Sequence, residues 1–140
     1  MRIMPRAPRV VLTYGRFDEF HQGHVNFLRQ ANQLGEELIV GCTTDDYAVA
    51  GAHPCAQNFD DRRAILQSCR FVSRVIPHNN SAQMRTDIVN YNVCTLVMGT
   101  EYVGEMDDMQ DIAQILYLPR KMPMPKGRRR TEILQLSAFG

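Results

Sequence analysis

The sequence predicts an α/β protein built on a doubly wound, parallel sheet in a single domain. Apolar runs of strand length alternate along the chain with segments whose apolar residues recur at helical spacing. The 140 residues match one domain, and 44% hydrophobic with 22% charged residues is ordinary for a folded chain. Strands that alternate with helices give parallel pairing with right-handed crossovers.

The first unit predicts a strand, a tight loop and a helix. Residues 10–12 are a short apolar run, and a helix beginning at or near His24 has apolar residues at positions 27, 28, 31 and 34. Gly35 is a natural helix stop, and Pro77 is expected to end a later strand. We expect the remaining strands at 38–42, 72–77, 95–99 and 115–120, helices at 60–69, 81–90 and 107–113, and a loop at 48–58.

The whole chain, residues 1–140, is predicted to be one domain with a short extension at residues 1–8 and a basic tail at residues 119–140. Residues 128–134 are expected to form a terminal helix. Its arginines are either a solvated face or a lid that closes on a triphosphate.

Composition excludes several classes of protein. A net charge of +1 argues against a dedicated nucleic-acid binder. No run approaches the ~20 apolar residues of a membrane span, and no apolar segment follows the basic N-terminus, so we expect a cytoplasmic protein. The four cysteines are widely spaced with no C-x-x-C pair, and three of them fall in apolar or amphipathic runs, which favours buried, reduced thiols over disulfides.

The loop after the first strand has the features of a phosphate site. A helix that begins beside it presents unpaired backbone N–H groups, and Gly15 and Gly23 permit close approach of a ligand. His21 and His24 are three residues apart, so both can face one ligand and donate hydrogen bonds to phosphoryl oxygens. Two unrelated surface histidines, or a pair of metal ligands, are the alternatives.

Gly15-Arg16-Phe17-Asp18 followed by His21-Gln22-Gly23-His24 resembles the G-x-F-D…H-x-G-H signature of the cytidylyltransferase branch of the nucleotidyltransferase superfamily. The chain is most similar to the small bacterial glycerol-3-phosphate cytidylyltransferases. The similarity runs from about residue 10 to residue 118 and includes residues 43–45, 61–63 and 97–99.

This resemblance implies a Rossmann-like fold and transfer of CMP from CTP to glycerol 3-phosphate or a related polyol phosphate, with release of pyrophosphate. It also implies Mg²⁺ with the triphosphate, a homodimer, and no partner that is a nucleic acid or a membrane. An ATP-dependent adenylyltransferase of the same fold and a non-catalytic nucleotide-binding module are the alternatives.

The resemblance also assigns roles to individual residues, without a metal ligand from the protein. Asp45 is alternatively a plain helix N-cap, and Arg62 a solvated helix charge. The implied catalytic residues are His21 and His24; the nucleotide contacts are Tyr14, Gly15, Arg16, Phe17, Gly23, Arg62, Met98, Gly99, Arg120, Arg130 and Thr131; and the acceptor contacts are Asp18, Asp45 and Glu101.

Three departures from the family pattern concern the substrates. Arg16 stands where the family has a small or β-branched residue, and residues 45–58 contain no lysine. Of the family's C-terminal motif, only Arg120 and at most Thr131 remain. We therefore expect the arginines at 128–130 to supply positive charge to the triphosphate, with a solvated helix as the alternative.

Overall fold

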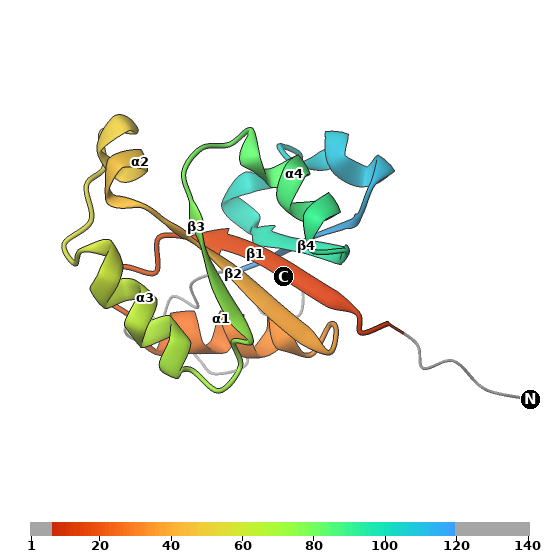
Figure 1. The fold of residues 1–140 in the computed structure, drawn as a ribbon, viewed down its shortest axis with the longest axis horizontal. Helices are drawn as coiled ribbons and strands as arrows, with labels where there is room; N and C mark the ends of the chain where they lie inside the picture. The colour runs from red at the N-terminus through yellow and green to blue at the C-terminus, as the bar shows by residue number, and fades with distance from the viewer. Residues whose placement is uncertain (1–6, 120–140) are drawn as a thin grey trace, which may run out of the picture.

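The computed structural model describes residues 7–119, and these residues form one five-stranded parallel sheet (Figure 1). The strand order is β3-β2-β1-β4-β5. The strands are β1 (Val10–Gly15), β2 (Glu37–Thr43), β3 (Arg74–His78), β4 (Val93–Gly99) and β5 (Gln114–Leu118). The helices are α1 (Gln22–Asn32), α2 (Asp45–Ala50), α3 (Phe59–Ser68) and α4 (Gln83–Asn90), with 3₁₀ turns at Thr100–Tyr102 and Asp107–Asp111. The predicted single-domain, doubly wound α/β class is confirmed.

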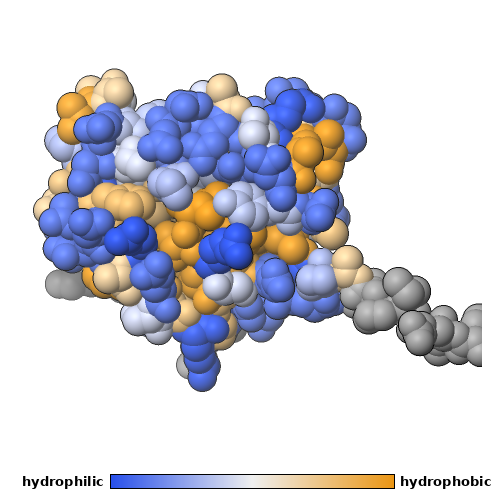
Figure 2. All heavy atoms as spheres, in the orientation of Figure 1, coloured by the Kyte–Doolittle hydropathy of each residue, from blue (hydrophilic) through white to orange (hydrophobic). Residues whose placement is uncertain are grey.

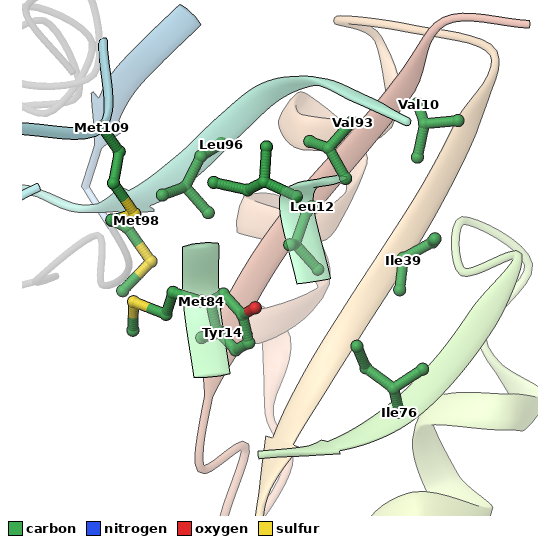
Figure 3. Close-up of a cluster of buried hydrophobic side chains, with 11 residues drawn as sticks. Val10, Leu12, Tyr14, Ile39, Ile76, Met84, Val93, Leu96, Met98 and Met109 are labelled. Atoms are coloured by element: carbon green, nitrogen blue, oxygen red, sulfur yellow. The ribbon is translucent and has the colours of Figure 1, made fainter. Parts of the chain in front are cut away.

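Helices cover both faces of the sheet, which explains why the central strands are mostly apolar. Helices α1 and α3 pack on one face, where Phe27 and Leu66 are almost fully buried. Helix α4 and the second 3₁₀ turn pack on the other, where Met84 and Met109 lie beside Tyr14 and Met98 (Figure 3). Two separate apolar cores therefore hold the central strands β1, β2 and β4 from opposite sides.

Helix α2 stands apart from these layers, beyond the carboxyl end of β2 (Figure 1). Figure 2 shows the same view with all atoms drawn. This face is mostly hydrophilic, with hydrophobic side chains gathered near its middle, where the strands lie in front in Figure 1. Within residues 7–119 no helix has the length and apolar character needed to cross a membrane.

Helix α1 begins at Gln22, near His24 as predicted, but other predicted boundaries were wrong. Helix α2 occupies part of the segment predicted as a loop, and Thr44 rather than Asp45 is its N-cap. Pro77 lies inside β3, which is an edge strand and therefore tolerates a residue without an N–H.

All four cysteines are free thiols, as expected. Only Cys42 is fully buried; Cys55 and Cys69 are half-buried and Cys94 is exposed. The apolar runs around the cysteines predicted that most of them are buried, and this is fully true of Cys42 alone.

Candidate active site

The candidate site lies at the carboxyl edge of the sheet, where β1 and β4 are neighbours. The chain leaves β1 toward α1 on one face, whereas the connections after β4 lead to the 3₁₀ turn on the other face. Open parallel sheets bind ligands at this kind of topological switch point. The loop that carries the two histidines begins here.

The two histidines cap the helix that follows them. His21 is the N-cap of α1, and its Nδ1 accepts a hydrogen bond from the N–H of Gly23 at 2.9 Å. The Nδ1 of His24 accepts one from the N–H of His21 at 3.0 Å, which completes a reciprocal capping box. Because both Nδ1 atoms are acceptors, each neutral ring carries its proton on Nε2. In each ring the hydrogen-bond donor is therefore Nε2–H.

Ring packing fixes the orientation of the second histidine. The ring of His24 stacks on Phe20 with centroids 5.3 Å apart and also contacts Phe17 and His21 at 5.5 and 4.1 Å. His21 is exposed and His24 half-buried. The positive end of the α1 dipole lies beside the two histidines. This dipole and the two imidazole rings together favour the binding of a phosphoryl group.

The loop between β1 and α1 has an unusual backbone. Phe17 and Glu19 both have a φ of 49°, in the left-handed region that non-glycine residues rarely adopt. The side chain of Phe17 is 4% exposed and belongs to the core of the α1–α3 face. Its burial offsets the backbone strain, and strain of this kind is common in ligand-binding loops.

Asp18 binds the protein itself. Its two carboxylate oxygens accept hydrogen bonds from the N–H groups of Ala56 and Gln57 at 2.7 and 3.0 Å. Desolvation raises its pKa, but these two N–H groups and the charges of Arg62 and Arg16 outweigh that effect and hold the pKa below its usual value. The predicted acceptor contact is thus a carboxylate that ties the loop after β1 to the segment before α3.

Asp45 has the same kind of role. It lies in the first turn of α2, and its carboxylate accepts from the N–H of Phe59 at 3.0 Å and from Nη2 of Arg62 at 2.8 Å. The Phe59 N–H is the main cause of its lowered pKa, with Arg62 adding to it. Asp45 is therefore a link between α2 and α3, not the N-cap that was the alternative.

Arg62 is the centre of these links, and its fully buried side chain rules out the alternative of a solvated helix charge. Its guanidinium joins the loop after β1, the end of β2, the first turn of α2 and the segment before α3. It donates to the carbonyl oxygens of Arg16 (3.0 Å), Thr43 (2.7 Å) and Gln57 (2.9 Å), to Oδ1 of Asp45 (2.8 Å) and to Sγ of Cys42 (3.4 Å). Arg62 therefore positions the edge of the site from within the protein.

Two predicted nucleotide contacts have buried side chains. Tyr14 is 1% exposed and Met98 2% exposed, both on the α4 face (Figure 3). The Tyr14 hydroxyl donates to Oδ2 of Asp87 at 2.7 Å, and its ring covers Gly41 so closely that a Cβ there would overlap it. Their side chains shape the core beneath the site, which leaves only their backbone for a ligand.

The remaining predicted residues lie at the carboxyl edge of the sheet or outside residues 7–119. Gly15 ends β1, Gly23 lies in the first turn of α1, and Gly99 ends β4. The carboxylate of the exposed Glu101 lies where a Cβ on Gly99 would be. Arg120, Arg130 and Thr131 fall outside residues 7–119, as does the predicted terminal helix.

Sequence reasoning missed a buried polar group at the end of β3. His78 is 4% exposed, and its ring packs on Tyr14 and Tyr47 at 4.3 and 5.0 Å. Its Nε2 has no hydrogen-bond partner among the described residues, and burial lowers its pKa despite the opposing influence of a hydrogen bond with the backbone of Asn80 and the charge of Asp87. No sequence signal marks this group, because Tyr14, Tyr47 and Asp87 come from three separate elements.

A glycine-bearing loop, a helix N-terminus and two imidazole rings meet at the switch point, an arrangement typical of α/β domains that bind phosphoryl groups. The chain belongs to the cytidylyltransferase-like family, whose model matches residues 12–125. The family expected from the sequence is confirmed.

Curated relatives are similar over nearly the whole chain. The glycerol-3-phosphate cytidylyltransferase of Bacillus subtilis is 35% identical over 126 residues, which are 90% of this chain and 98% of the relative. That of Staphylococcus aureus is 34% identical over 110 residues, 79% of this chain and 83% of the relative. A solved structure, the lipopolysaccharide core biosynthesis protein from Thermoplasma volcanium, has a TM-score of 0.70 at 21% identity and covers 79% of this chain and 96% of its own. That last likeness supports the fold alone.

Proposed function

We propose that this protein transfers CMP from CTP to glycerol 3-phosphate, or to a related small polyol phosphate, and releases pyrophosphate. The observation that carries the proposal is the pair of histidines at the N-terminus of α1, whose Nδ1 atoms cap the helix so that each ring has Nε2–H as its donor. The relatives named glycerol-3-phosphate cytidylyltransferase support CTP as the donor and glycerol 3-phosphate as the acceptor.

In this reaction an oxygen of the acceptor's phosphate attacks the α-phosphorus of CTP in line. The new O–P bond forms as the bond from the α-phosphorus to the bridging oxygen of the β-phosphate breaks, and pyrophosphate leaves with that electron pair. The chain supplies position and charge stabilisation, with no covalent enzyme intermediate. The Nε2–H groups of His21 and His24 and the first N–H groups of α1 donate to the phosphoryl oxygens as negative charge grows there.

We infer that Mg²⁺ enters with the triphosphate. Mg²⁺ is usually held by substrate phosphates and few protein ligands, and it would screen their charge. Of the three predicted acceptor carboxylates, Asp18 and Asp45 are already bound by backbone N–H groups. Removal of divalent ions with EDTA should abolish turnover, and added Mg²⁺ should restore it.

The remaining proposals rest on the sequence. Arg120, Arg130 and Thr131 are proposed to contact the triphosphate. We further propose a cytoplasmic homodimer, which light scattering coupled to gel filtration tests directly.

A pyrophosphate-release screen of four nucleoside triphosphates against polyol and sugar phosphates tests the function. The expected result is release with CTP and a polyol phosphate. Equal or faster release with ATP would replace the cytidylyl assignment by the adenylyltransferase alternative. Nucleotide binding without turnover for any acceptor would favour the non-catalytic module.

A further inference from the structure

Arg16, the first residue after β1, carries a guanidinium that the fold fixes at the edge of the site. Its carbonyl oxygen accepts from the buried Arg62, and the left-handed Phe17 follows it directly. Its own Nη2 donates to the carbonyl oxygen of Pro54 at 3.1 Å. Both ends of the residue are therefore held, and the side chain extends toward the α2–α3 connection.

This direction separates Arg16 from the β4 side of the site. In the sheet, β2 and β4 are the two neighbours of β1. Pro54 belongs to the connection that follows β2 and α2, whereas Gly99 ends β4 and Glu101 follows it. Two substrates that meet at the histidines must approach from different sides, and Arg16 lies on the β2 side.

The guanidinium keeps most of its hydrogen-bonding capacity. An arginine has five N–H donors, and the contact with Pro54 uses one of them. No carboxylate within residues 7–119 lies within ion-pair distance of it. The charge of Arg16 contributes to the lowered pKa of Asp18, but both oxygens of that carboxylate are bound by backbone N–H groups.

Other arginines near this edge differ in this respect. Arg62 is buried and paired with Asp45, and Arg63 pairs with Asp60 at 3.4 Å. A half-buried guanidinium with a fixed backbone and open donors is suited to the paired oxygens of a phosphate. Arg16 is also the chain neighbour of Phe17, whose ring contacts His24.

We propose that Arg16 binds the phosphate of the acceptor and sets one of its oxygens for attack on the α-phosphorus. It thereby makes a phosphomonoester the preferred acceptor. This inference rests on the proposed function, and it moves Arg16 from the nucleotide contacts, where the family resemblance placed it, to the acceptor side.

Steady-state kinetics of Arg16→Gln and Arg16→Lys test this role, with KM measured separately for CTP and for glycerol 3-phosphate. We expect the glutamine variant to raise the KM for glycerol 3-phosphate at least tenfold and leave that for CTP within twofold. Lysine, which keeps the charge without the fork, should fall between. Arg70→Gln is the matched control. Arg70 is exposed and precedes β3, so it lies near the amino ends of the strands, whereas the site lies at their carboxyl ends. Thermal melts check that each variant folds.

A rise in the KM for CTP alone, or no change in either KM, would overturn the role of Arg16. An inactive parent protein would instead contradict the proposed function. In that case calorimetric titration of glycerol 3-phosphate, with a non-hydrolysable CTP analogue bound, decides the matter. Glycerol 3-phosphate binding at least tenfold weaker in Arg16→Gln than in the parent supports the proposal. Equal affinity in the two proteins, or no binding to the parent, rejects it.

Discussion

His21 and His24 each use the two nitrogens of one ring for different purposes. Nδ1 completes the helix cap, and Nε2 carries the donor proton of the ring. The spacing of three residues predicts their shared face, but it does not predict the cap. Serine, threonine, aspartate and asparagine are the usual N-caps, so a histidine box gives no recognised signal in a sequence.

Replacing His21 by asparagine should separate the two functions. Asparagine still offers an oxygen to cap α1, but it has no N–H at the position of Nε2. We expect kcat to fall by about 100-fold or more, the scale for one lost transition-state donor, while the melting temperature changes little. His21→Ala should lose the same activity and in addition about 1 kcal/mol of stability. Near-normal turnover in both variants would make His21 a surface residue without a role in the reaction.

Thr13 presents a different residue-scale case. It is fully buried, and its Oγ1 has no hydrogen-bond partner in the described part of the chain. Valine has nearly the same shape without the unsatisfied hydroxyl, so Thr13→Val should raise the free energy of unfolding by about 1 kcal/mol in urea titrations.

The control for Thr13 is another buried threonine. The Oγ1 of Thr95 donates to Gln114 at 3.4 Å, so Thr95→Val removes a bond and should not stabilise. Equal effects of the two substitutions would show that the hydroxyl of Thr13 is satisfied.

At the scale of elements, the buried strands were predictable and α2 was not. The central strands are apolar because both faces are covered, and such runs stand out in a sequence. Helix α2 has six residues, of which only Ala48 is buried, so it lacks an apolar period. It is held instead by the Thr44 cap and by the bonds of Asp45 to Phe59 and Arg62.

Arg62→Met should show how much of this arrangement depends on one side chain. Methionine fills part of the space but leaves the carbonyl oxygens of Arg16, Thr43 and Gln57 without their donor. The expected loss is roughly 3 kcal/mol or more in the free energy of unfolding, measured by urea denaturation. Hydrogen exchange at residues 54–58 should accelerate.

Arg63→Met on the same helix is the comparison, because Arg63 is exposed and its ion pair with Asp60 lies in solvent. Such pairs contribute 0 to about 1 kcal/mol, so its stability should stay near that of the parent. A loss as small in Arg62→Met would mean that the loops hold their positions without the guanidinium.

For the whole molecule, the sequence predicts where the site lies better than what its charged residues do. Alternation of strands and helices places Gly15, His24 and Asp45 at one edge, and the structure has them there. Asp18 bonds to residues 38 and 39 positions further along the chain, and Asp45 bonds to a residue 14 positions further along. No local sequence pattern predicts such pairs.

His78 should couple global stability to pH. Burial lowers its pKa from the ordinary 6.5, with Asp87 acting in the opposite direction. The unfolded chain then binds a proton at a higher pH than the folded one, so the contribution is complete above about pH 6.5 and is lost as the pH falls through the folded pKa. The free energy of unfolding should therefore decrease over that window.

His78→Phe keeps a ring between Tyr14 and Tyr47 but cannot titrate. The difference between the two proteins, followed by urea denaturation at several pH values, isolates the contribution of His78 from that of the other histidines. Parallel pH profiles would show that His78 titrates alike in the folded and unfolded states.

The bonds between residues 54–58 and the loop after β1 have a kinetic consequence. Asp18, Gln57 and the carbonyl of Pro54 already join these two segments before any substrate arrives. A ligand that docks on this side meets a preorganised wall and loses little conformational entropy in ordering it. Association there should therefore follow a single exponential in stopped-flow traces, with an observed rate linear in ligand concentration and no plateau from a slow loop closure.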